Sequence, residues 1–114
     1  MGLFSKEETV FEENDIHMGE VDYTNVTGTG YSNVVTFAFS VKKGKAIRAK
    51  VKSDKPVDVV IAYEDNSMAG EKVGVTDDTV GPFQTKKCTN MGLILGIYPG
   101  DRANVSVRVW TDSK

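Results

Sequence analysis

Few residues in this chain have side chains suited to catalysis, and they are scattered along it. There is one histidine, His17, and one cysteine, Cys88. A nucleophilic thiol needs a neighbouring base, yet the residues around Cys88 read Lys86-Lys87-Cys88-Thr89-Asn90 and contain no nucleophile motif. Copper and zinc sites need more imidazole or thiolate ligands than these two residues supply. We therefore expect no enzyme activity and no cofactor.

Acidic side chains offer the remaining metal chemistry. Glu64 and Asp65 precede Asn66, and Asp77 adjoins Asp78, so two segments carry the oxygen ligands that calcium accepts. Neither segment has the spacing of a calcium loop, and Asp and Asn are also favoured in turns because they bond locally to the backbone. The four carboxylates are calcium candidates only if the two segments meet at one end of the fold. Solvated turn residues are the alternative.

Positive charge is concentrated in one stretch of the chain. Seven of the 14 basic residues lie between positions 42 and 55, and Arg48, Lys50 and Lys52 alternate on the predicted outer face of one strand. Acidic residues are concentrated before position 23, so opposite charges on a nearby N-terminal strand would pair with the lysines. Lysines also guard exposed sheet edges. The functional alternative is an anion-binding ridge, although a net charge of −2 and the lack of interleaved aromatics argue against nucleic acid.

Two aromatic residues near the C-terminus complete the candidate binding set. Trp110 is predicted to point outward beside Arg108, where it would stack on a partner or a sugar, or else cover the end of the fold. Tyr98 ends a preceding apolar run. The predicted binding residues are Arg48, Lys50, Lys52, Tyr98, Arg108 and Trp110.

The elements that must position these residues are β-strands. Alternating apolar residues, as in Val35, Phe37 and Phe39, are typical of strands with one buried face. A strand should be interrupted at 53–56, because Pro56 has no backbone N–H to donate to a neighbouring strand. The aspartate-rich segment 77–82 is predicted to be a connection between strands. The predicted strands are 34–41, 47–52, 57–63, 91–98 and 103–111, preceded by one or two short strands at 10–11 and 16–23. Shorter candidates lie at 71–75 and 83–89, and loops are expected at 24–33 and 42–45.

No segment has helical periodicity, so seven or eight short strands predict an all-β antiparallel sandwich with a jelly-roll-like arrangement. A closed barrel is the alternative. We expect a flexible arm over residues 1–8 and a single domain over 9–114. No apolar run approaches the roughly 20 residues of a membrane span. The lack of a signal sequence and the single cysteine predict a cytoplasmic protein.

The stretch TFAFSVKKGKAIRAKVKSDKPVDVVIAYED resembles the core of small jelly-roll sandwiches of the prepeptidase C-terminal and Golgi-dynamics (GOLD) type. The shared pattern falls on Phe37–Val41, Gly44, Ile47–Val51 and Pro56–Asp65, and GIYPGDRANVSVRVW is similar to the closing strand pair. The resemblance covers about half of the chain and carries no catalytic signature. It implies a sandwich core. The secretory roles of GOLD proteins are not implied, since no transmembrane or coiled-coil segment accompanies it.

Taken together, the sequence predicts a non-enzymatic binding module that contacts a protein or a glycan through a sandwich face or its end loops. An anion-binding module that uses Arg48, Lys50 and Lys52 is the first alternative. A small enzyme with acidic-loop or cysteine chemistry is the second.

Overall fold

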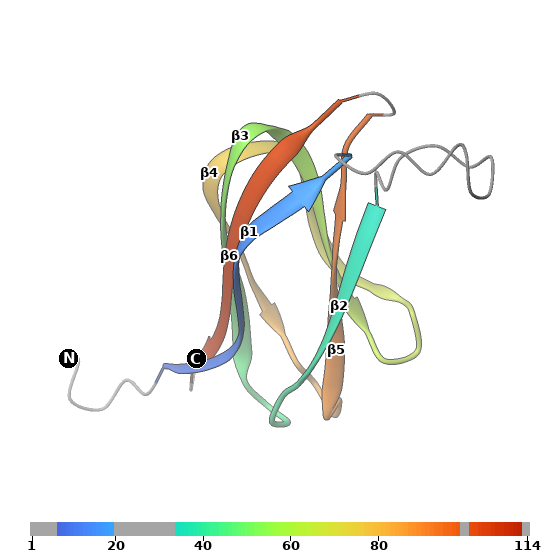
Figure 1. The fold of residues 1–114 in the computed structure, drawn as a ribbon. Coiled ribbons are helices and arrows are strands. Elements are labelled where there is room, and N and C mark those ends of the chain that lie inside the picture. Colours follow the sequence, from blue (N-terminus) through green and yellow to red (C-terminus); the bar gives the residue numbers. More distant parts are fainter. Residues whose placement is uncertain (1–6, 20–33, 99–100, 113–114) are drawn as a thin grey trace.

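The computed structural model describes residues 7–19, 34–98 and 101–112, and they form six β-strands (Figure 1). All strand pairings are antiparallel, and no described residue is helical. The described part of the chain thus offers no helix with the length and apolar character to cross a membrane. The predicted all-β antiparallel class is confirmed. The strands are β1 (Glu8–Met18), β2 (Val34–Ser40), β3 (Ala46–Tyr63), β4 (Met68–Gln84), β5 (Asn90–Gly96) and β6 (Ala103–Asp112).

Two long strands, β3 and β4, build both layers of the sandwich. The first half of β3, 46–53, pairs with β6, and its second half, 58–63, pairs with β5. On its other side β3 pairs with β4 along both halves. One layer is therefore β1-β6-β3-β4, here called the first layer, and the second layer is β2-β5-β3-β4. The register between β3 and β4 is irregular from Lys52 to Val57, where the hairpin passes from one layer to the other (Figure 1).

The strand count is six in the described residues, because two predicted interruptions lie inside continuous strands. The break expected at 53–56 is part of β3, and Pro56 is tolerated there because it lies in the irregular stretch that has no ladder partner in β4. The connection expected at 77–82 is part of β4. Gly81, with φ 111°, lets β4 follow β3 closely, since a Cβ at this position would lie 2.7 Å from the carbonyl oxygen of Ile47.

A third correction concerns the strand predicted at 83–89. Only Phe83 and Gln84 belong to β4, and 85–89 form the connection to β5. The turn residue Gly44 has φ 69°, as expected for a reversal between β2 and β3. Residues 1–6 of the expected arm, 20–23 of an expected strand and the loop at 24–33 lie outside the described residues. Glu8 opens β1 and pairs with Thr111 of β6.

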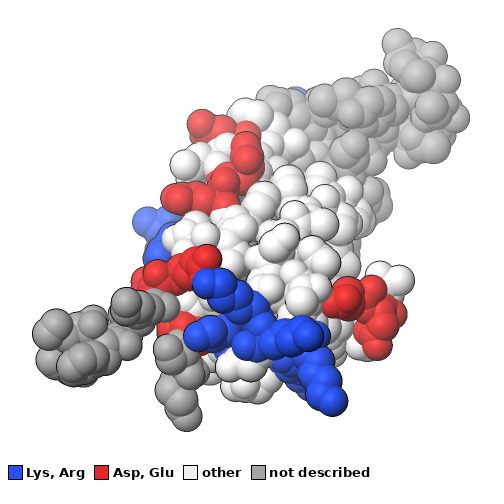
Figure 2. Space-filling model, turned by 90° about the horizontal axis from the view of Figure 1, so that it is seen from below, with Lys and Arg blue, Asp and Glu red and all other residues white. Residues whose placement is uncertain are grey.

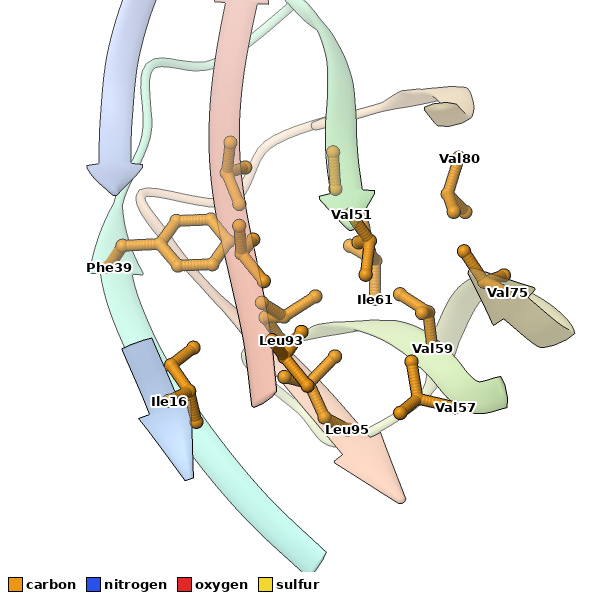
Figure 3. Close-up of a cluster of buried hydrophobic side chains, with 14 of the residues drawn as sticks. Ile16, Phe39, Val51, Val57, Val59, Ile61, Val75, Val80, Leu93 and Leu95 are labelled. Atoms are coloured by element: carbon orange, nitrogen blue, oxygen red, sulfur yellow. The ribbon is translucent and has the colours of Figure 1, made fainter. Parts of the chain in front are cut away.

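The core lies between the two layers (Figure 3). Its fully buried members alternate along the strands as the sequence predicts. Phe11 of β1 closes the sandwich on the side of β2, with its ring centre 4.8 Å from that of Phe37 and 6.1 Å from that of Phe39. Burial of each large apolar side chain stabilises the fold by roughly 1.5–3 kcal/mol. The apolar face of each strand therefore points inward, and the alternate side chains remain on the outside. The buried residues include Ile47, Val51, Val59, Ile61, Leu93, Leu95, Val107 and Val109.

Candidate functional site

Five of the six predicted binding residues share the outer face of the first layer. Arg48 of β3 is the register partner of Trp110 in β6, and Lys50 is the partner of Arg108. Trp110 is half-buried, and the Arg108 guanidinium lies 4.8 Å from the centre of its ring. Lys52 follows on the same face of β3. We call this set the sheet face: Arg48, Lys50, Lys52, Arg108 and Trp110.

Tyr98 lies apart from the sheet face. Its side chain is 80% exposed, and its carbonyl oxygen accepts a hydrogen bond from the Asp101 amide, just before β6 begins. Trp110 lies near the other end of β6. At about 3.3 Å per residue, the two aromatics are separated by most of the length of that strand. They cannot contact one small ligand together.

Carboxylates on neighbouring strands pair with the cations of the sheet face. Arg48 Nη1 donates to Asp112 Oδ2 at 2.6 Å, and both side chains are half-buried. Lys50 Nζ lies 2.9 Å from Asp77 Oδ1, and its hydrogen bond is the largest cause of a lowered pKa for that carboxyl. An anion arriving at this face would therefore have to compete with carboxylates that are already in place.

Arg108 is held by residues at the start of the described chain, in and just before β1. Its Nε donates to Thr9 Oγ1 at 2.9 Å, and its Nη2 lies 3.3 Å from Glu7. The N-terminal acidic segment was expected to lie near the lysine strand. In the structure β6 lies between β1 and β3, so Glu7 forms its ion pair with Arg108 of β6 rather than with a lysine of β3.

The four calcium candidates are not brought together. Glu64 Oε1 accepts hydrogen bonds from the amides of Thr89 and Asn90, and Asp65 accepts from Ser67 in the β3–β4 turn. Asp77 and Asp78 lie further along β4, where they pair with Lys50 and Lys72. The register places Asp77 opposite Lys52 and Met68 opposite Ala62, so the two pairs are separated by roughly 30 Å of strand. Within the described ranges, no three acidic, histidine or cysteine residues form a metal-binding group.

His17 and Cys88 also lie apart. The His17 imidazole hydrogen-bonds to the side chain of Asn104, near the start of β6. The Cys88 amide donates to Thr85, which contacts Lys45 directly before β3 begins. Because Ala46 is the register partner of Asp112 at the end of β6, the thiol and the imidazole lie at opposite ends of that strand, roughly 25 Å apart. A nucleophile and its base must lie within hydrogen-bond reach.

A second cationic site, which the sequence did not indicate, lies at one end of the sandwich. The β2–β3 turn and the β4–β5 connection are joined there by backbone bonds: Gly44 N donates to Lys86 O, and Thr85 N donates to Lys45 O, both at 2.8 Å. The two segments thus bring five lysines together. We call this site the lysine end: Lys42, Lys43, Lys45, Lys86 and Lys87.

One buried side chain holds the two lysine-bearing segments in place. Thr85 is completely buried, and its Oγ1 donates to the Lys42 carbonyl at 2.8 Å and accepts from the Lys45 amide at 2.9 Å. A hydroxyl group can donate one hydrogen bond and accept another at the same time. The positions of the lysine backbones are therefore set by the fold and not by a partner.

Carboxylates border the lysine end on two sides. Figure 2 shows a band of basic side chains across this end, with acidic groups on either side of it. Lys42 Nζ lies 3.3 Å from Glu8 Oε1, and Lys86 lies 4.7 Å from the centre of the Tyr63 ring. The pKa of Asp65 is lowered, mainly by hydrogen bonds from Ser67 and to a smaller extent by the charge of Lys86. The site therefore presents a mixed pattern, with a positive centre and negative borders.

A cavity of about 540 Å³ adjoins the lysine end. The Tyr63 hydroxyl donates to the Gln84 carbonyl at 2.8 Å, which fixes one wall. The half-buried Cys88 packs against the core on the other side. The cavity gives a partner a recess beside the charged surface. Its lining residues are Tyr63, Glu64, Asp65, Ser67, Lys86, Lys87 and Cys88.

Comparison with known proteins assigns no family. No family model matches the chain, and no curated protein matches it. One similar solved structure is described as "Carbohydrate-Binding Module CBM36 in complex with calcium and xylotriose". It is 14% identical, the alignment covers 92% of this chain and 98% of that one, and the TM-score is 0.40. A likeness of this degree carries no information on what this chain binds.

Proposed function

We propose that this protein is a non-enzymatic interaction module that binds a partner protein through the lysine end. The observation that carries the proposal is the convergence of five lysines from two segments on a scaffold locked by the buried Thr85. A charged surface that is already ordered loses little backbone entropy when it binds. Complementary charge also speeds the encounter with an acidic partner.

The borders of the lysine end favour a protein over an acidic glycan. Glu8, Glu64 and Asp65 lie beside the lysines, and they would repel a chain of uniform negative charge. A protein surface can present an acidic centre with basic surroundings, which matches both signs. The cavity at Tyr63 suits an apolar side chain of the same partner.

The chemistry of the described residues agrees with a binding role. His17 and Cys88 are held at opposite ends of β6, and the acidic pairs are engaged in local bonds. The resemblance to prepeptidase C-terminal and GOLD-type cores likewise carries no catalytic signature. Sandwiches of this kind take their role from the surface that each one presents.

Two synthetic peptides test the proposal. Both carry the same number of glutamates at their centre, and only one has lysines at both ends. We expect the mixed peptide to bind at least as tightly as the uniformly acidic one, in fluorescence anisotropy, with an affinity that falls as salt is added. A uniformly acidic peptide that binds more tightly would favour a polyanion instead.

A matched pair of double variants locates the site. Lys43→Glu with Lys87→Glu should weaken peptide binding by roughly tenfold or more, since two attractive pairs become repulsive. Lys50→Glu with Lys52→Glu makes the same charge change on the sheet face and should leave binding nearly unchanged. The assignment would be contradicted if the Lys43→Glu, Lys87→Glu variant bound the peptide as tightly as the parent. It would also be contradicted if the Lys50→Glu, Lys52→Glu variant lost as much affinity as the first variant. The second outcome would restore the anion-binding ridge.

A further inference from the structure

The sandwich has three edge strands in its described part, and they are protected unequally. β4 is an edge of both layers, β1 is the other edge of the first layer, and β2 is the other edge of the second. Exposed edges present unpaired backbone groups to other chains, and proteins usually block them with charges, bulges, glycine or proline. The three strands can be compared on these terms.

β4 and β1 both carry such devices. β4 bends at two glycines with positive φ, Gly74 and Gly81, and bears Lys72, Asp77 and Asp78. β1 has two register shifts against β6, a residue with φ 59° at Asp15, and several carboxylates. Neither strand offers a straight, uncharged template for another chain.

β2 carries none of these devices. Its sequence, VVTFAFS, contains no charged residue, glycine or proline, and its register with β5 is unbroken over seven residue pairs. Phe11 covers the inner side of the strand through Phe37 and Phe39. On the outer side Val34 is 59% exposed. Within the described ranges β2 is hydrogen-bonded only to β5, and although β1 lies near it, the second backbone edge of β2 has no hydrogen-bonded strand.

We propose that β2 pairs antiparallel with β2 of a second copy of this chain. A two-fold axis at Phe37 would place Val35 opposite Phe39 on the inner face and Thr36 opposite Ala38 on the outer face. No charge meets a like charge in this register, and pairs of aromatic with β-branched residues are favourable across strands. The interface is isologous and closes at two copies. It joins the two second layers into one sheet.

This inference goes beyond the proposed function and does not depend on it. A second copy is favoured over an unrelated peptide because the two-fold register about Phe37 gives the favourable pair of Val35 with Phe39 twice, and β2 has no charge to oppose it. The contact also leaves the lysine ends of the two copies pointing in opposite directions, since the paired strands are antiparallel. A dimer would then display two lysine ends.

Disulfide trapping tests the register. In a Cys88→Ser background, Val34→Cys and Ser40→Cys are introduced together; directly opposite residues have Cα atoms about 4.5–5.5 Å apart, within disulfide range. Within one chain the two positions are separated by roughly 20 Å of strand, so they cannot pair internally. Under mild oxidation we expect a covalent dimer on a non-reducing gel. Val34→Cys alone is the control and should not cross-link.

Sedimentation velocity on the full unmodified chain gives the second readout. We expect a concentration-dependent dimer that Thr36→Lys weakens by about tenfold, while Thr79→Lys on the guarded edge β4 leaves it unchanged. Circular dichroism checks that both variants fold. A chain that stays monomeric at every concentration would overturn the proposal. Slow amide hydrogen exchange of β2 in such a monomer would show that the chain's own residues cover this edge. The proposal would also be overturned if Thr36→Lys left the dimer intact and the Val34→Cys, Ser40→Cys variant formed no disulfide-linked dimer.

Discussion

The sheet face and the lysine end carry the same kind of side chain in opposite electrostatic settings. On the sheet face, Arg48 and Lys50 are paired with Asp112 and Asp77 on adjacent strands. At the lysine end, the ion pairs among described residues are limited to the exposed contact of Lys42 with Glu8. Half of the basic residues lie in one stretch of sequence, yet the structure divides all of these except Lys55 between the two settings.

The difference arises from what each segment has beside it. A residue on a strand has neighbours at fixed register positions on both sides, so β4 and β6 can supply carboxylates to β3. A turn has no such neighbours, and its side chains face water unless another loop approaches. Cations on the sheet face therefore contribute to folding, whereas those of the lysine end remain available to a partner.

The largest effect is expected from releasing the lysine end. Thr85→Val keeps the side-chain shape but removes the hydroxyl that bonds to Lys42 O and Lys45 N. Two backbone groups then lose their partners in a partly buried place, which should lower the free energy of unfolding by about 2–4 kcal/mol. Urea denaturation measures this loss as a lower midpoint with an unchanged slope.

The control for this substitution is Thr79→Val on exposed β4. It makes the same chemical change at a surface position and should stay within about 0.5 kcal/mol of the parent. A loss in Thr85→Val no larger than that of the control would contradict the view that Thr85 locks the two segments.

A smaller effect is expected from the half-buried pair of the sheet face. A double-mutant cycle with Arg48→Met and Asp112→Asn should give a coupling of about 1–2 kcal/mol, between the values typical of exposed and buried pairs. The matched cycle with Lys50→Met and Asp77→Asn should give about 1 kcal/mol or less, because both side chains are exposed. Couplings in the reverse order would break the link between burial and pairing on this face.

The features that sequence could predict are those that depend on one strand at a time. Alternation placed Val51, Val59 and Leu93 in the core, and it placed Trp110 outward beside Arg108. These assignments need only the two-residue period of a strand and the burial of apolar groups. The class of fold followed from the same pattern.

The features that sequence missed depend on pairing between distant segments. Lys45 and Lys86 are 41 positions apart and meet only because β4 follows β3 along its whole length. That continuity was hidden because Pro56 and the aspartates at 77–78 are common in turns. The pairing of Asp112 with Arg48 likewise needs the order β6-β3, and local patterns carry no information about strand order.

The smallest effect is a pH dependence at the exposed pair of the sheet face. The hydrogen bond from Lys50 and the charges of Lys50 and Lys52 hold the pKa of Asp77 below its ordinary value of 3.8. The ionised carboxylate is thus favoured in the folded state, so its stabilising contribution is complete above the ordinary value and is lost as the pH falls through the folded pKa. Asp77→Asn should unfold at lower urea than the parent near neutral pH, and the difference should vanish in acid. In a Lys50→Met background the same substitution should show little pH-dependent difference. A gap that stays constant from neutral pH into acid would mean that Asp77 acts through its shape and not its charge, and that its ion pair with Lys50 contributes nothing to stability.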